Sequence, residues 1–229
     1  MSLVQACNAC GILINSGLDQ CVYCGWRPAR PYSDSQAEAR IREIQTALAG
    51  PPQDIESAFE LARLHLRLGK NALGIMHLRT ALNMAPGEPQ IRILLVLASA
   101  NANGPLPIGI QDEALPHLEW LETTHPRRYE TRWLSTYHQL WGMYDQQQWE
   151  RGETLGAQAI VDFPENALLH YVYGYVLLRP QAKADKRSLA RFDAALLAMK
   201  LAADLNPRLS TPPQNIEAIQ QQISVWEQG

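Results

Sequence analysis

Residues 55–88 read IESAFELARLHLRLGKNALGIMHLRTALNMAPGE, and they contain two helix-like runs separated by Gly69. Glycine adopts positive φ without strain, so it suits a tight turn between two helices. Pro86 stops the second run, because proline lacks the amide hydrogen that a helix interior requires. Gly74 and Ala81 stand twelve and five residues before that proline, and small side chains there let the second helix pack closely on the first. The stretch therefore predicts a helical hairpin.

The same spacing recurs along the chain. Proline follows a helix-like run at four positions: Pro86, Pro126, Pro164 and Pro207. The residues five before them are Ala81, Leu121, Ala159 and Ala202, and those twelve before them are Gly74, Ala114, Gly152 and Ala195. Such internal repetition is typical of solenoids, in which each hairpin packs on its neighbours. Hairpins are therefore expected near 55–84, 88–124, 127–162 and 166–205.

This pattern resembles the tetratricopeptide repeat, and the first unit has the 34-residue period of that family. Leu61 and Ala62 match the leucine–small pair of the family's first helix. The resemblance implies an all-α fold, a right-handed solenoid of TPR-like hairpins. The later repeats are longer, and their extra residues are expected as insertions at 101–109 and 179–187.

In this repeat family the first helix of each hairpin lines a concave groove that binds a peptide or helix of a partner protein. The resemblance places Phe59 and Arg63 in the groove of the first repeat, and Tyr171 and Tyr175 in that of the fourth. The alternative is that the tyrosines pack between neighbouring hairpins. The lysine–asparagine clamp that the family uses for acidic tails is missing, so an apolar or amphipathic segment is the expected ligand.

The third repeat leaves its register open by one residue. One register points Tyr137 and Trp141 into the groove, and the other buries both rings and exposes His138.

Both flanks of the repeats contain amphipathic segments. A short helix is expected over 36–49, where one stripe contains Ala37, Ile41, Ile44 and Leu48. Residues 214–228 place four apolar side chains on one face, which are Ile216, Ile219, Ile223 and Trp226. That face is expected to cover the open end of the last hairpin, although it would also suit a partner. The predicted domains are a metal module at 1–30, a linker and short helix at 31–53, and the repeats with their capping helix at 54–229.

All four cysteines of the chain lie within CNACGILINSGLDQCVYCGW, residues 7–26. Cys7 and Cys10 form one C-x-x-C pair, Cys21 and Cys24 form a second, and ten residues separate the pairs. Two such pairs brought together by a hairpin give four thiolates in a closed tetrahedral shell, which suits structural Zn²⁺. Iron takes the same ligands and is the less favoured occupant. A redox pair and two disulfides are the remaining alternatives.

The cysteine segment resembles a zinc ribbon, and QCVYCGWRP at 20–28 is similar to the rubredoxin-type metal module that closes some helical-repeat scaffold proteins. Each pair is followed by a glycine, Gly11 or Gly25, where positive φ lets the turn close. Tyr23 and Trp26 are expected to pack over the metal-binding turns, with a partner-binding face as the alternative.

Composition and motifs argue against several classes of function. The net charge is −3, and no basic cluster accompanies the cysteines, so nucleic acid is not the expected ligand. Signatures of hydrolases, metalloproteases and nucleotide-binding proteins do not occur in the sequence, so an enzyme is not expected. No apolar run reaches the roughly 18–20 residues that span a bilayer, and residues 1–6 do not read as a secretory signal. A cytoplasmic protein is therefore expected.

These features predict a non-enzymatic scaffold or adaptor that binds a protein partner in a repeat groove. A nucleic-acid-associated adaptor, in which the ribbon touches RNA or DNA, is the main alternative, and the charge balance argues against it. A subunit held in a larger complex by its whole surface is the third hypothesis.

Overall fold

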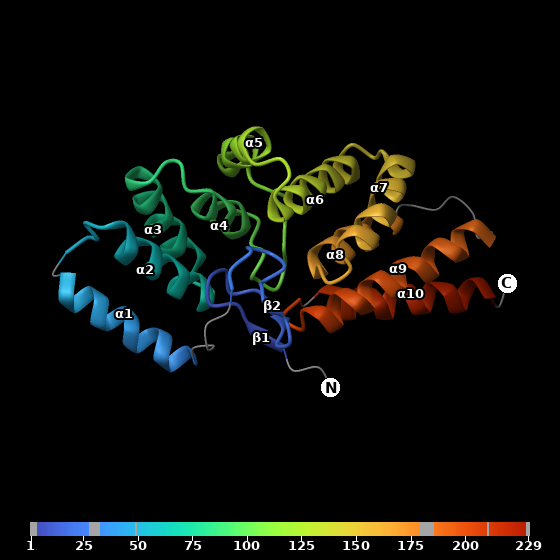
Figure 1. Cartoon of the computed structure of the whole chain (residues 1–229). Coiled ribbons are helices and arrows are strands. Elements are labelled where there is room, and N and C mark those ends of the chain that lie inside the picture. Colours follow the sequence, from blue (N-terminus) through green and yellow to red (C-terminus); the bar gives the residue numbers. More distant parts are fainter. Residues whose placement is uncertain (1–3, 28–32, 49, 179–185, 210, 228–229) are drawn as a thin grey trace. The chain divides into compact units, whose positions relative to one another are not determined.

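The chain consists of two compact units, Met1–Arg132 and Trp133–Gly229. The computed structural model describes residues 4–27, 33–48, 50–178, 186–209 and 211–227. Across these residues it contains ten α-helices, one short 3-10 helix and one two-stranded sheet (Figure 1). In the described parts of the chain, no helix is both long enough and apolar enough to cross a bilayer. The expectation of an all-α repeat fold with a small β element at its N-terminus is confirmed.

The first unit begins with a small hairpin and continues as stacked helices. Its elements are β1 (Val4–Ala6), β2 (Leu13–Asn15), α1 (Asp34–Leu48), α2 (Ile55–Arg67), α3 (Asn71–Met84), α4 (Pro89–Ser99), η1 (Asp112–Ala114) and α5 (Leu115–Thr124). Helix α6 (Tyr129–Asp145) begins in this unit and continues into the second, which also contains α7 (Trp149–Asp162), α8 (Ala167–Leu177), α9 (Lys186–Leu205) and α10 (Thr211–Glu227).

The four proline stops act as the sequence predicts. The helices before them end at Met84, Thr124, Asp162 and Leu205, two residues ahead of each proline. The intervening residue leaves helical geometry because the proline ring clashes with a preceding residue in the α region. Hairpins α2–α3, α4–α5, α6–α7 and α8–α9 therefore begin and end within a few residues of the expected bounds.

The turn of the first hairpin is a Schellman-type helix end. Gly69 has φ +70°, its amide donates to the Leu66 carbonyl at 2.9 Å, and the Lys70 amide donates to the His65 carbonyl at 2.9 Å. Both bonds satisfy carbonyl groups that the end of α2 would otherwise leave without partners. Helix α3 approaches α2 closely at Gly74. A Cβ on Gly74 would lie 2.7 Å from Cγ of Leu66, so only glycine leaves enough room there.

Helix α1 packs on the first hairpin. Its buried stripe is Ala37, Ile41 and Ile44, and these side chains form a core with Leu61 and Leu64 of α2. The short amphipathic helix predicted from the sequence is thus confirmed, and it covers the outer side of the first repeat.

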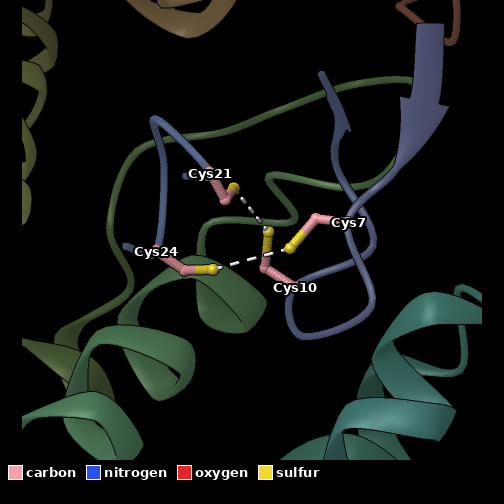
Figure 2. Close-up of side chains that lie close together, drawn as sticks. All are labelled: Cys7, Cys10, Cys21 and Cys24. Atoms are coloured by element: carbon pink, nitrogen blue, oxygen red, sulfur yellow. Dashed lines mark hydrogen bonds between the residues drawn. The ribbon is translucent and has the colours of Figure 1, made fainter. Parts of the chain in front are cut away.

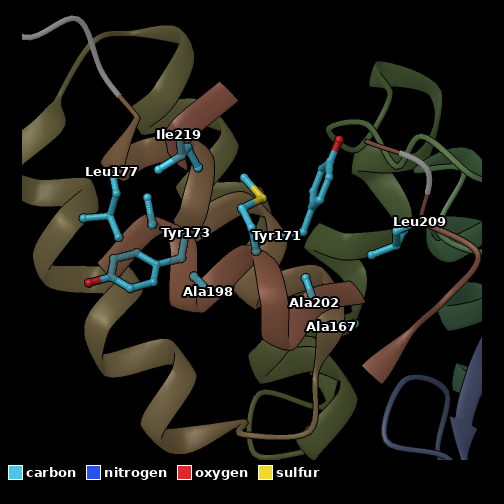
Figure 3. Packing of buried hydrophobic residues seen from close by; sticks show 10 residues of the cluster. Ala167, Tyr171, Tyr173, Leu177, Ala198, Ala202, Leu209 and Ile219 are labelled. Atoms are coloured by element: carbon cyan, nitrogen blue, oxygen red, sulfur yellow. The ribbon is translucent and has the colours of Figure 1, made fainter. Parts of the chain in front are cut away.

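The second unit has its own core around α8. Almost every residue of α8 is buried, and its side chains pack against α9, on which α10 packs in turn (Figure 3). Ile219 of α10 is buried in this core, with Ile216 and Ile223 partly buried beside it, as expected for a capping helix. The side chain of Trp226 lies outside the described part of the structure.

The structure describes the whole of the first predicted insertion but only the end of the second. Residues 101–109 form the irregular connection between α4 and α5, as expected. Asn103 in this connection is buried and donates from Nδ2 to the Leu66 carbonyl at 2.6 Å. Most of the second insertion, 179–185, falls outside the described residues.

Candidate metal centre

The four cysteine sulfurs converge on one buried point. The Sγ atoms of Cys7 and Cys24 lie 3.7 Å apart, and those of Cys10 and Cys21 lie 3.8 Å apart (Figure 2). All four sulfurs lie within 4.8 Å of one another, and all four residues are buried. The two C-x-x-C pairs thus form one ligand set, as their spacing predicts.

Two matching turns bring the sulfurs together. In each turn the amide of the first cysteine donates to the carbonyl five residues later: Cys7 to Ile12 at 2.9 Å, and Cys21 to Trp26 at 2.8 Å. The glycine after the second cysteine donates back to the first cysteine's carbonyl, at 3.0 Å and 2.9 Å. Gly11 has φ +76° and Gly25 has φ +70°, so the conformation that closes both turns favours glycine. We call these turns the first knuckle (7–12) and the second knuckle (21–26).

The sulfur spacing fits a tetrahedral metal ion. A Zn–S bond of about 2.3 Å places the sulfurs of a regular tetrahedron about 3.8 Å apart, which matches both measured distances. A disulfide needs sulfurs about 2.05 Å apart, and all four cysteines are free. The residues therefore suit a closed, structural four-thiolate site rather than disulfides.

The electrostatics of the cluster also favour a bound cation. Burial raises the pKa of the Cys10 and Cys24 thiols, while hydrogen bonds from the neighbouring thiols, Cys10 first, lower the pKa of Cys7. Four adjacent thiolates repel one another in a buried site, so they require a positive charge among them. A divalent metal supplies that charge and lets all four thiols ionise.

The first knuckle packs against the C-terminal end of α2. A Cβ on Gly11 would overlap the Leu66 carbonyl oxygen and lie 3.0 Å from Cα of Arg67. Arg67 is itself buried and donates from Nη1 to the Ala6 carbonyl at 3.1 Å. The close approach at Gly11 involves the backbone of α2, and the Arg67 side chain adds a hydrogen bond to it.

The second knuckle contacts α4 and the first turn of α6 through a chain of polar groups. Gln90 Nε2 donates to the Cys24 carbonyl, and Arg128 Nη2 donates to Gln90 Oε1 at 3.0 Å. Arg128 Nε also pairs with Glu130 Oε2 at 2.8 Å, and the Glu130 side chain is only 4% exposed. Glu130 lies so close to Gly25 that a Cβ there would overlap its carboxylate. No local sequence signal marks these polar residues as neighbours of the cysteines.

We call residues 4–27, which contain both knuckles, the ribbon, and its two aromatic residues differ in what they contact. Tyr23 is buried in the ribbon, as expected. Trp26 instead packs on α2: its ring centroid lies 6.4 Å from that of Phe59, edge to face, and the Arg63 guanidinium lies 4.2 Å from the Trp26 ring centroid. The two groove residues predicted in the first repeat are therefore in contact with the chain's own ribbon.

The aromatic residues predicted in the later repeats divide between core and surface. Tyr137 and Tyr171 are buried, and Tyr171 belongs to the core of the second unit. His138, Trp141 and Tyr175 are half-buried. The third repeat thus follows neither predicted register fully, since it buries Tyr137 but leaves Trp141 partly accessible.

Further half-buried aromatic rings lie beside Trp141 and Tyr175. Trp141 is surrounded by Tyr137, Tyr144, Tyr171 and Tyr175, with ring centroids 5.8–6.5 Å away. Tyr144 also contacts Trp149 at the start of α7, at 5.8 Å. We call the partly accessible rings Trp141, Tyr144, Trp149 and Tyr175 the aromatic surface of the second unit. Sequence reasoning missed Trp149 because it lies outside the first helix of its repeat.

No protein-family model matches the chain, and no curated protein sequence matches it. Among solved structures, the human IFIT1 dimer with m7Gppp-AAAA is similar to it, with a TM-score of 0.55 at 15% sequence identity. The similarity covers 85% of this chain but only 43% of the IFIT1 chain. At that identity the likeness concerns the fold alone, and it shows that this chain has a TPR-like helical fold. The buried four-cysteine cluster is a separate observation on this chain.

Proposed function

We propose that the chain is a non-enzymatic adaptor that binds a segment of a partner protein on the aromatic surface of its second unit. The observation that carries this proposal is the group of four partly accessible rings on α6, α7 and α8. Aromatic rings contribute large apolar contact areas, and they are enriched where proteins bind one another. A short apolar or amphipathic segment suits such a surface.

The four-cysteine cluster is proposed to hold one structural Zn²⁺ through Cys7, Cys10, Cys21 and Cys24. Its closed set of four protein ligands leaves no open position for a substrate, which supports a structural rather than a catalytic role. Reduced thiolates of this kind suit a reducing compartment, and a cytoplasmic location accords with them. Iron is the alternative occupant, and metal analysis of the purified protein distinguishes the two.

RNA is the second candidate ligand for the same surface. Bases stack on aromatic side chains without sequence preference, and the solved structure of similar fold contains m7Gppp-AAAA. The overall charge of −3 makes the phosphate backbone a poorer match than an apolar peptide.

The test compares two paired variants in the full chain. Tyr144→Ser with Tyr175→Ser removes two rings of the aromatic surface, and Val161→Ser with Leu197→Ser removes two exposed apolar side chains elsewhere in the same unit. Cross-linked partners are captured from lysate with and without nuclease and identified by mass spectrometry. The proposal expects the tyrosine pair alone to lose a defined set of proteins, whether or not nuclease is present.

Two results would contradict the protein-partner proposal. Loss of capture after nuclease treatment of the unaltered chain would favour RNA. Unchanged capture by the tyrosine pair would place the binding surface elsewhere. Thermal melting of both variants provides the control for folding.

A further inference from the structure

Trp26 of the ribbon lies against the two residues that the family resemblance assigns to the groove of the first repeat. Phe59 and Arg63 are one helical turn apart on α2, and Trp26 lies against both of them. The Arg63 guanidinium is also 5.1 Å from the Phe59 ring centroid. An edge-to-face ring contact together with a cation–π contact forms a site for an aromatic side chain.

The second knuckle holds Trp26 in place. The Trp26 carbonyl accepts the Cys21 amide at 2.8 Å, and Cys21 in turn accepts the Gly25 amide at 2.9 Å. Trp26 is therefore the last residue of the knuckle, and its backbone is fixed by the turn that carries two metal ligands. A turn of this size depends on its metal for folding energy.

Two hydrogen bonds from the helices also end at or beside the knuckles. Gln90 binds the carbonyl of a cysteine ligand, and Arg67 binds the carbonyl of Ala6, which precedes another. The two carbonyls face Gln90 and Arg67 while the adjoining knuckles keep their shape.

Helix α2 has a second source of stability. Its Leu61 and Leu64 pack with the α1 stripe, and its other side packs along α3. These contacts do not involve the ribbon, so α2 can stay folded when the ribbon leaves.

We propose that the ribbon is a metal-held plug: Trp26 occupies a binding site for an aromatic side chain on α2, and loss of the metal vacates that site for an aromatic residue of a partner protein. This site consists of residues of the first unit, whereas the aromatic surface belongs to the second. An experiment can therefore contradict the plug without contradicting the proposed adaptor function, and the reverse.

Hydroxyl-radical footprinting of the full chain tests the plug, because it measures how accessible each aromatic side chain is to solvent. Three forms are compared: the metal-loaded chain, the chain after chelation under reducing conditions, and metal-loaded Trp26→Ala. We expect labelling of Phe59 to rise several-fold in the second and third forms. Phe163, a buried phenylalanine of the second unit, is the matched control and should not change.

Circular dichroism and a chemical rescue complete the test. The helical signal should survive chelation, and N-acetyltryptophanamide should protect Phe59 in Trp26→Ala by supplying the missing indole. Unchanged Phe59 labelling after chelation would overturn the plug, since the ribbon would then stay docked without metal. Loss of the helical signal would also overturn it, because the ribbon would then be part of the core. Absence of protection by the indole would show that the face is not an aromatic-binding site.

Discussion

Gly11→Ala isolates the contribution of ribbon docking to the stability of the first unit. Gly11 has φ +76°, and a Cβ there would overlap the Leu66 carbonyl oxygen and lie 3.0 Å from Cα of Arg67. Both neighbouring atoms belong to the backbone of α2 or its end, so no side-chain rotation can relieve the overlap. The first knuckle must instead move away from the helix.

The expected cost has two parts. Left-handed geometry costs an alanine about 1–2 kcal/mol. Displacement of the knuckle breaks the hydrogen bond from buried Arg67 to Ala6, which contributes about 1.5–3 kcal/mol because the donor is charged. We therefore expect Gly11→Ala to lower the free energy of unfolding of the first unit by about 2.5–5 kcal/mol.

Gly69→Ala is the matched control. Gly69 has φ +70°, but nothing lies within 4 Å of the position that its Cβ would take. It should therefore cost only the conformational part, about 1–2 kcal/mol. Gly25→Ala adds a control within a knuckle, since its Cβ would meet the side chain of Glu130 rather than a backbone.

Urea denaturation followed by circular dichroism, at constant free Zn²⁺, measures all three variants. The transition of the first unit is recognised by its dependence on metal. Equal destabilisation by Gly11→Ala and Gly69→Ala would refute the reasoning, because it would show that the ribbon contributes nothing by lying against α2.

Three other predictions follow from individual sites. Purified chain should contain one equivalent of zinc by elemental analysis, and Cys21→Ser should lose it; a metal-free wild type under reducing conditions would contradict the site. Burial, with smaller effects from His77 and Lys70, lowers the pKa of His65 to about 4. Unfolding therefore takes up a proton below about pH 6.5, and stability should fall by up to about 3 kcal/mol between pH 6.5 and 4; urea titrations should show a flatter profile for His65→Gln. Tyr171→Ala should lower the melting temperature of the second unit far more than Tyr175→Ala, since Tyr171 is 3% exposed and in the core; equal shifts would contradict that assignment.

Helix boundaries were predictable because their causes are local. Each proline acts on the residue before it, and Gly69 acts on the helix end that it follows. The pairing of sulfurs within each C-x-x-C turn was predictable for the same reason, since such a turn brings its two sulfurs together with few other residues. In these cases the information lies within a few positions of the structure that it determines.

Burial of individual rings was not predictable in this way. Tyr171 and Tyr175 are four residues apart on one helix, so periodicity places them on the same face. Their burial differs because Tyr171 lies within the core of the second unit, whereas Tyr175 is only packed against its edge. Trp26 and Phe59 are 33 positions apart, and no repeat pattern relates a residue of the ribbon to one of α2.

If the chain binds metal and a protein partner as proposed, the position of Trp26 limits how tightly the metal-loaded chain can bind that partner. The first-repeat site is then filled, and Tyr137 and Tyr171 are buried. A partner would meet chiefly the aromatic surface of the second unit, where covering two large side chains contributes about 3–6 kcal/mol. Association itself costs about 4–15 kcal/mol, so that surface alone favours weak, reversible binding. On the proposal above, loss of the metal would open the Phe59–Arg63 site of the first unit to an aromatic residue of a partner, and burying one large side chain there contributes about 1.5–3 kcal/mol. Metal occupancy would then control affinity although none of the four cysteines touches the partner.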